Sequence, residues 1–314
     1  MPRDTETALI SVVTPCFNAA ATLEESVASV MGQSYPHIEM ILVDDGSTDH
    51  TAAIGARLHH QDQRVRLVSQ ENRGAARARN HGLALASGRY IAFLDADDYW
   101  SPDCLAALHD ALVRSPDAAL AYCGWQNVGC PGGRGDPFVP PNYESGKKLE
   151  ILLAACRWPI HAALTKREAI EAAGRFDERL TSCMDYDLWL KIATADRIVR
   201  VPKVLAYYRH HDGEQITKNR TKIALNHLRV QHNYLDAHPD VEERLGTAKV
   251  RNLVYGELLN RGYESYWARD LVAARAIFRE VMRHRFGEIK DWKYMLPSWL
   301  PLGLHQRLVA WADD

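Results

Sequence analysis

The sequence predicts an α/β protein in which a mostly parallel sheet is flanked by helices and followed by a C-terminal helical extension. Apolar runs begin at Ile10, Ile38, Val65 and Tyr90, and helical patterns separate them. Strands that alternate with helices at this spacing indicate right-handed βαβ units. The composition, 46% hydrophobic and 25% charged over 314 residues, is that of a globular chain with a full core.

Each early element has its own signal. The runs ISVVT, IEMILV, VRLVS and YIAFL are short and rich in β-branched or aromatic residues, which favours strands. Leu23, Val27, Val30 and Met31 form one apolar stripe of a helix, and the segment Ala75 to Leu85 is rich in alanine. Ligands of such sheets bind beyond the carboxyl ends of the strands, so the residues there are the candidates for function.

Composition and missing motifs exclude several classes of protein. The formal charge is −2, which argues against a nucleic-acid-binding protein. There is no GxGxxG or GxxxxGK[ST] motif, which argues against dinucleotide-binding enzymes and P-loop enzymes. Six cysteines without a CxxC pair fit a reducing cytoplasm, and no apolar run reaches the length of a membrane span. We therefore expect a soluble or peripheral cytoplasmic protein.

Carboxylates follow two of the predicted strands. Asp44 ends the second strand, where it can accept a hydrogen bond from a base or ribose. Asp95, Asp97 and Asp98 follow the fourth, and three carboxylates so close together repel one another. A divalent cation removes that cost, and Mg²⁺ or Mn²⁺ is commonly held by one or two carboxylates together with substrate phosphates.

Several ordered motifs carry a family resemblance. VVTPCFNAAATLEESVASVMGQSY, ILVDDGSTDHT, NRGAARARNHGL and GRYIAFLDADDYW, with the later GRFDERLTSCMDYDLWLKIA and VLAYYRHHDGEQIT, resemble the inverting family 2 nucleotide-sugar glycosyltransferases of the GT-A fold. The resemblance runs from about residue 9 to residue 217. It implies a GT-A catalytic domain over residues 1–214, with a nucleotide-sugar half at about 1–100 and an acceptor half at about 101–214. Residues 215–314 would form the helical C-terminal region.

The resemblance also implies the donor site, a nucleotide-sugar substrate and a bound Mn²⁺ or Mg²⁺. Asp97 would ligate the metal, Asp95 would contact ribose or metal, and His211 would close over the metal and diphosphate. Arg77 or Arg79 would contact the nucleotide, and the sequence does not choose between them; either could instead be a helix residue paired with Glu71 or Asp98. The remaining donor-site residues are Pro15, Phe17 and Asp44 around the base, and Ala96 within the Asp-x-Asp pair.

The catalytic base implied by the resemblance is Asp185. The family often has Glu before this Asp, whereas this chain has Met184. Asp187 follows two residues later, and at the start of a helix we expect it to interact with the helix dipole. An acceptor hydroxyl is a poor nucleophile, so a carboxylate must take its proton while a metal stabilises the leaving diphosphate. One base and one metal suffice for single displacement, and the family match predicts inversion of the anomeric centre.

Two regions are open to alternative interpretations. The Gly- and Pro-rich segment from Gly129 to Tyr143 is either a mobile acceptor lid or a surface insertion. Apolar stripes through Leu258 and Leu259 and through Ile277 and Phe278 predict a helical hairpin further on. Residues 269–314 then combine an arginine-rich helix with three tryptophans, which suits peripheral membrane contact, homodimer contact, or a cap on the catalytic domain.

The leading hypothesis is a metal-dependent inverting glycosyltransferase that transfers a sugar, with a UDP-sugar favoured, to a saccharide or lipid-linked acceptor. Its pathway would be the assembly of cell-surface polysaccharide or glycolipid. The alternatives are a sugar-1-phosphate nucleotidyltransferase and an inactive sugar-nucleotide-binding partner subunit. TPCFNAAATL lacks the Gly-rich, basic loop expected of the first alternative, and only Met184 favours the second.

Overall fold

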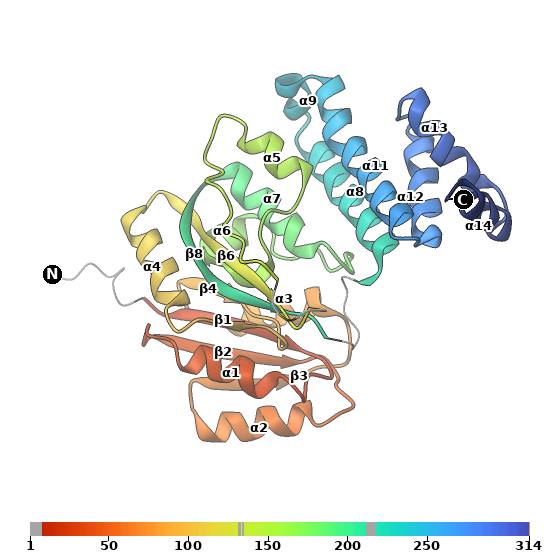
Figure 1. The fold of residues 1–314 in the computed structure, drawn as a ribbon. Helices are drawn as coiled ribbons and strands as arrows, with labels where there is room; N and C mark the ends of the chain where they lie inside the picture. Colours follow the sequence, from red (N-terminus) through yellow and green to blue (C-terminus); the bar gives the residue numbers. More distant parts are fainter. Residues whose placement is uncertain (1–7, 131–132, 134, 212–217, 314) are drawn as a thin grey trace. The chain divides into compact units, whose positions relative to one another are not determined.

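A computed structural model describes residues 8–130, 133, 135–211 and 218–313. It divides into two compact units: residues 1–152 with 156–213, and residues 153–155 with 214–314. Figure 1 shows a sheet with flanking helices in the first unit and helices in the second.

The first half of the first unit alternates strands and helices as expected. The central strand β1 pairs in parallel with β2 and β4, and β2 pairs in parallel with β3. The carboxyl ends of these strands therefore lie at one edge of the sheet. The elements are β1 (Ile10–Cys16), α1 (Leu23–Met31), β2 (Ile38–Asp44), α2 (Thr51–Gln61), β3 (Val65–Ser69), α3 (Ala75–Leu85) and β4 (Tyr90–Phe93).

The second half of this unit makes the sheet mixed. The strand order is β3-β2-β1-β4-β7-β6-β8-β5, in which β7 is antiparallel to β4 and β6, β5 is antiparallel to β8, and β6 is parallel to β8. This topology brings the end of β8 next to the turn that follows β4. The elements are β5 (Tyr99–Trp100), α4 (Cys104–Arg114), β6 (Ala118–Val128), α5 (Lys148–Ala154), η1 (Ile160–Ala162), β7 (Ala163–Lys166), α6 (Arg167–Ala172), α7 (Met184–Ala195) and β8 (Arg197–Arg209).

The described residues of the second unit are helical apart from short connections. Helices α11 and α12 form the expected hairpin, with Leu258, Leu259, Ile277 and Phe278 buried in it. A π-helical turn precedes α11. The elements are α8 (Arg220–Ala237), α9 (Asp240–Leu245), α10 (Thr247–Arg251), the π-helix η3 (Asn252–Gly256), α11 (Glu257–Trp267), α12 (Leu271–Arg283), α13 (Ile289–Met295), η4 (Leu296–Trp299) and α14 (Leu302–Asp313). In the part of the chain that the structure describes, no helix is long and apolar enough to cross a bilayer.

Candidate active site

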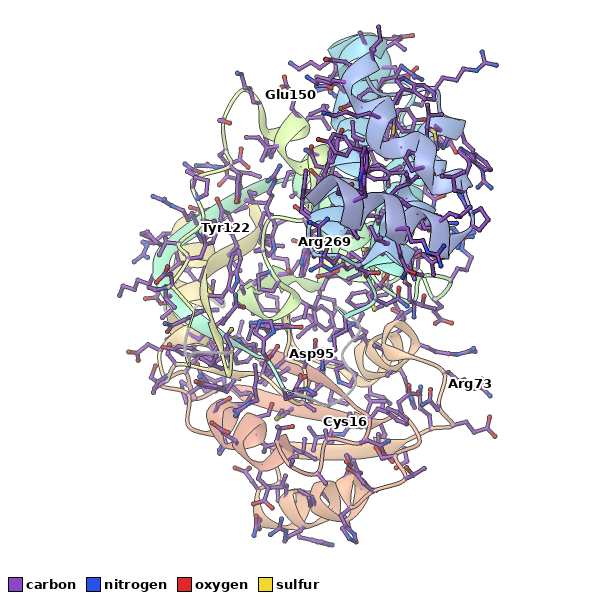
Figure 2. All side chains as sticks on the ribbon, turned by 45° about the vertical axis from the view of Figure 1, so that its right-hand side comes forward. Cys16, Arg73, Asp95, Tyr122, Glu150 and Arg269 are labelled. Atoms are coloured by element: carbon purple, nitrogen blue, oxygen red, sulfur yellow. The ribbon has the colours of Figure 1, made fainter. Side chains whose placement is uncertain are left out.

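The acidic strand ends meet at the carboxyl edge of the sheet. Asp44 is the register partner of Cys16, and the fourth strand, which precedes Asp95, lies on the other side of β1. Burial and the nearby charges of Asp44 and Asp95 raise the pKa of the Cys16 thiol above its usual range, so the thiol lies close to both carboxylates. Figure 2 shows Cys16 and Asp95 in this part of the first unit.

The residues expected around the nucleotide base lie at this edge with different exposures. Asp44 is buried and accepts a hydrogen bond from the backbone N–H of Ser47 at 3.2 Å. Phe17 exposes 46% of its surface directly after β1, whereas Pro15 is half-buried and Ala96 is buried. An exposed aromatic ring can stack on a base, and a buried carboxylate at the same edge of the sheet can accept a hydrogen bond from that base.

Asp97 lies between acidic neighbours and a histidine from a distant strand. Its Oδ2 is 3.1 Å from Nε2 of His211, a residue that follows β8. Burial and the charges of Asp98 and Asp95 raise the pKa of Asp97 to about 6, although the His211 contact opposes this. The structure thus brings the three expected metal-site residues, Asp95, Asp97 and His211, to one turn and one strand end.

The donor set fits a divalent cation that also binds the substrate. Among the described residues, no three His, Cys, Asp or Glu side chains form a cluster that could hold a metal alone. Mg²⁺ and Mn²⁺ sites commonly use one or two carboxylates and take further oxygen ligands from phosphates and water. Burial and the acidic neighbours that raise the pKa of Asp97 disfavour its charged form, which a bound cation would stabilise. A metal held by Asp97, with Asp95 and His211 beside it, would relieve this.

Asp98 has a structural role that the sequence did not indicate. It is buried, with Oδ1 accepting the backbone N–H of Arg209 at 2.8 Å and Oδ2 lying 3.0 Å from Nδ1 of the fully buried His161. Burial opposes protonation of His161, but the carboxylates of Asp98, Asp95 and Asp97 together outweigh it and raise the histidine's pKa. His161 therefore relieves part of the repulsion among the carboxylates of the acidic turn. No local pattern pairs residues 98 and 161, because the mixed sheet brings them together.

The two arginines of α3 occupy different environments. Arg79 is buried, forms an ion pair with Asp95, and donates from Nη1 to the sulfur of Met184 at 3.0 Å. Arg77 is half-exposed, and its Nε is 3.5 Å from Glu178. Neither pairs with Glu71 or Asp98, the structural partners considered from the sequence. Arg79 is thus the α3 arginine that reaches the acidic turn.

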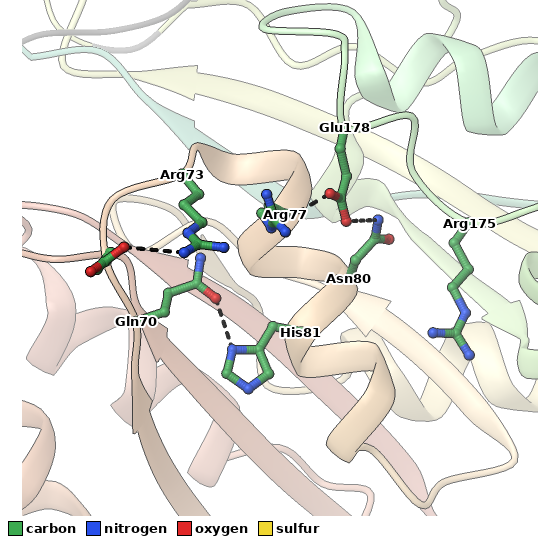
Figure 3. A pocket seen from close by; sticks show the side chains of 8 residues that line it. Gln70, Arg73, Arg77, Asn80, His81, Arg175 and Glu178 are labelled. Atoms are coloured by element: carbon green, nitrogen blue, oxygen red, sulfur yellow. Dashed lines mark hydrogen bonds and ion pairs between the residues drawn. The ribbon is translucent and has the colours of Figure 1, made fainter.

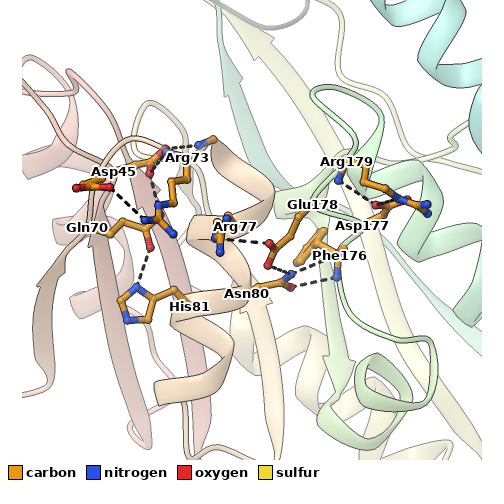
Figure 4. Close-up of polar contacts among 12 residues, drawn as sticks. Asp45, Gln70, Arg73, Arg77, Asn80, His81, Phe176, Asp177, Glu178 and Arg179 are labelled. Carbon is orange, nitrogen blue, oxygen red and sulfur yellow. Dashed lines mark hydrogen bonds and ion pairs between the residues drawn. The ribbon is translucent and has the colours of Figure 1, made fainter.

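Arg77 instead lines a surface pocket of about 460 Å³ in the first unit (Figure 3). Asn80 fixes one wall, because its side-chain amide exchanges hydrogen bonds with the backbone N–H and C=O of Phe176 at 3.1 and 3.0 Å. Asp45 fixes the other wall, since its carboxylate accepts the backbone N–H groups of Arg73 and Gly74 (Figure 4). Asp45 therefore shapes the loop that begins α3, a role that the sequence pattern did not reveal.

Asp185 lies in the first turn of α7 and is partly buried. Burial is the main cause of the raised pKa of Asp185. The nearby Arg79 lowers this pKa and the nearby Asp95 raises it, so Asp185 lies near both side chains. The Sγ of Cys156 is 4.0 Å from its Oδ2. A carboxylate with a raised pKa beside an acidic turn suits a general base.

Asp187 lies in the same turn but has a different partner. It is buried, and its Oδ2 accepts a hydrogen bond from Nζ of Lys191 at 2.7 Å, one helical turn further along. Its carboxylate therefore has an internal cation, as a structural residue of a helix does. Met184, at the position where the family often has Glu, is buried against Arg79.

The mixed α/β sheet with its flanking helices is that of the GT-A fold. The sequence model described as "Glycosyl transferase family 2" matches residues 11–171, and the chain belongs to this family. A Bacillus subtilis protein named as a teichuronic acid biosynthesis glycosyltransferase, TuaG, is 42% identical over 132 residues, which are 42% of this chain and 52% of that protein. The matched part spans about half or less of the length of the first curated relatives.

Solved structures share the fold. Residues 1–349 of S. aureus TarS in complex with UDP-GlcNAc superpose with a TM-score of 0.64 at 19% identity, covering 87% of this chain and 81% of that one. The mannosyltransferase PcManGT of Pyrobaculum calidifontis, in complex with GDP-Man and Mn²⁺, gives 0.56 at 20% identity and covers 100% and 90%. At these identities the likeness shows the GT-A fold alone.

Proposed function

We propose that the chain is a metal-dependent, inverting glycosyltransferase that moves a sugar from a nucleotide-diphosphate donor to an acceptor hydroxyl. The observation that carries the proposal is the grouping of four side chains at the acidic turn. Asp97 contacts His211, Asp95 forms an ion pair with the buried Arg79, and Asp185 lies near that pair. Family membership favours glycosyl transfer over nucleotidyl transfer. The catalytic domain would be the first unit, which agrees with an assignment of residues 1–214.

The chain's own residues supply binding, orientation and a base. Asp44, Phe17 and Pro15 would hold the base of the nucleotide, while Arg79 orients Asp95 toward the ribose. Asp97 and His211 would hold Mn²⁺ or Mg²⁺, which when bound offsets the charge of the leaving diphosphate. Asp185 would take the acceptor's proton as the new C–O bond forms and the bond to the diphosphate breaks. Direct attack from the opposite face inverts the anomeric centre.

The similar proteins suggest a donor and a pathway for this chain. A UDP-sugar is favoured, since the TarS structure contains UDP-GlcNAc, and a GDP-sugar is the alternative suggested by PcManGT. The name of TuaG suggests cell-surface polysaccharide assembly. A thermal-shift screen of UDP, GDP and their sugars, each with Mn²⁺ or Mg²⁺, would distinguish the donors because a bound ligand raises the melting temperature.

The acceptor would be a saccharide or a lipid-linked saccharide. The segment 129–143 is the proposed acceptor lid; residues 131, 132 and 134 lie outside the described residues. Phe138 exchanges two backbone hydrogen bonds of 2.9 Å with Trp125, which attaches the later part of this segment to β6. We place the protein in the cytoplasm, in keeping with its six free cysteines, with peripheral membrane or homodimer contact through residues 269–314.

Replacement of the base tests the proposal. We expect Asp185→Asn to lower transfer by about 100-fold to 10,000-fold, because an amide cannot accept the acceptor's proton. Binding of donor and Mn²⁺, measured by calorimetry, should persist. Asp187→Asn is the matched control and should change the melting temperature more than the turnover.

Full transfer by Asp185→Asn would overturn the base assignment. Met184 favours one other function, that of a sugar-nucleotide-binding partner subunit. Donor binding by the natural chain, without turnover on any saccharide or lipid-linked acceptor in a broad screen, would support that function instead.

A further inference from the structure

The last helix of the chain carries apolar side chains on two faces. His305 and Val309 are buried, and Nη1 of Arg275 on α12 lies 3.5 Å from Nδ1 of His305. Leu304, Leu308 and Trp311, spaced at i, i+4 and i+7, share a different face and expose 49%, 46% and 79% of their surfaces. One face of α14 therefore packs inside the second unit, while the other exposes large apolar groups.

The segment before α14 also exposes large apolar side chains. Leu296, Trp299 and Leu300 expose 55%, 57% and 37% of their surfaces. Arg279 fixes the segment, since its Nε donates to the carbonyl of Ser298 at 3.0 Å and its guanidinium lies 5.2 Å from the centre of the Trp299 ring. We call these three residues, with Leu304, Leu308 and Trp311, the C-terminal apolar stripe.

The region that contains the stripe has a small excess of basic residues. Residues 269–314 contain eight Lys and Arg against six Asp and Glu. The arginines of α12 do not form a free basic face, because Arg275 and Arg279 contact α14 and η4. Lys293 and Arg307 are exposed, and neither has a carboxylate partner within the described ranges of the chain.

We propose that the C-terminal apolar stripe docks the protein on an anionic lipid surface. Tryptophan and leucine at an exposed helix face insert at the boundary between headgroups and acyl chains, and nearby Lys and Arg attract anionic headgroups. A symmetric dimer through the same surface would instead bury Arg307 of both copies, for which no described carboxylate of the chain is a partner. The inference deepens the membrane contact of the proposed function, but it does not depend on the catalytic chemistry.

Vesicle co-sedimentation of the full chain tests the proposal. The protein should bind equimolar phosphatidylglycerol and phosphatidylcholine vesicles, and it should bind pure phosphatidylcholine much more weakly. The double variant Leu308→Ser/Trp311→Ser should lose about tenfold or more in affinity, because it removes two inserted side chains. Arg307→Glu should lose roughly fivefold or more, and this loss should fade at high salt.

Leu225→Ser is the matched control, since Leu225 is an exposed apolar residue of α8 outside the stripe. It should bind vesicles as the natural chain does. Failure to bind anionic vesicles, or equal binding by the double variant, would overturn the proposal. A dimer in sedimentation equilibrium that the double variant abolishes, without vesicle binding, would assign the stripe to a second copy.

The outcomes for lipid docking and for catalysis can be told apart. The double variant should keep the melting-temperature increase with UDP and Mn²⁺, because no donor-site residue is changed. Asp185→Asn should keep vesicle binding while losing transfer. Loss of only one property therefore identifies which proposal has failed.

Discussion

Asp97 and Asp98 are adjacent residues of the same type, yet their surroundings give them different roles. Asp98 is buried, and it lies against His161 and the backbone of Arg209. Asp97 keeps part of its surface exposed beside His211, and its pKa is raised to about 6. The fully buried carboxylate stabilises the turn, whereas the partly exposed carboxylate is accessible to a metal.

The two α3 arginines give a paired test at the residue scale. We expect Arg79→Met to destabilise the fold by about 2–4 kcal/mol, because it leaves the Asp95 carboxylate without its buried partner. It should also weaken nucleotide binding in the presence of Mn²⁺. Arg77→Met should cost less than about 1 kcal/mol, since the pair with Glu178 is half-exposed.

Urea unfolding and calorimetric titration with UDP would measure the two effects. Similar losses of stability and nucleotide affinity in both variants would contradict the separate roles of Arg77 and Arg79.

At the scale of elements, α3 connects the core of the sheet to the candidate site. Its Gly82 lies so close to β1 and β2 that an added Cβ would clash with Val13 and lie 3.2 Å from Val43. This approach places the helix against the strands whose ends carry the candidate donor site. Arg79, one turn before Gly82, is thereby held in position to reach Asp95.

Gly82→Ala tests this packing. The extra methyl group must displace α3 or Val13, so we expect a loss of about 1–3 kcal/mol in the free energy of unfolding, measured by urea denaturation. Gly303→Ala in the exposed first turn of α14 is the control, because a Cβ there meets no neighbour. Its stability should be unchanged or slightly raised. A neutral Gly82→Ala would show that the helix can shift freely.

At the scale of the whole molecule, the acidic turn should make stability depend on pH. The pKa of Asp97 in the folded chain is about 6, above its ordinary value of 3.8. The folded chain therefore holds this proton more tightly than the unfolded chain. The resulting stabilisation is complete below pH 4 and is lost as the pH rises through 6.

Asp97→Asn removes this titration. With a chelator present, we expect the variant to exceed the natural chain in stability by about 1–3 kcal/mol at pH 8 and to match it near pH 4. Asp117→Asn is the control with the opposite sign, because Arg197 lowers the pKa of the exposed Asp117. Thermal unfolding at both pH values would measure this. A difference that does not change with pH would contradict the assigned pKa.

The Asp97→Asn variant should also lose the stabilisation that UDP and Mn²⁺ give to the natural chain. A gain in stability together with a lost response to metal would show that Asp97 lowers the free energy of unfolding in order to bind the metal.

The sequence alone determined the first four strands, their order along the chain and the acidic residues that follow them. These features depend on local periodicity, so Ile10, Ile38, Val65 and Tyr90 begin strands as the pattern predicts. It also determined the helical hairpin of the second unit, since apolar residues at helical spacing must bury one face.

Only the tertiary structure decided which of the similar side chains reach the candidate site. The division between Arg77 and Arg79, and between Asp97 and Asp98, depends on partners 16 to 114 residues away in sequence. The mixed sheet brings those partners together, and no local sequence pattern encodes the order of its strands. The same holds for α14, where the sequence indicates an apolar helix but only packing shows which of its faces is covered.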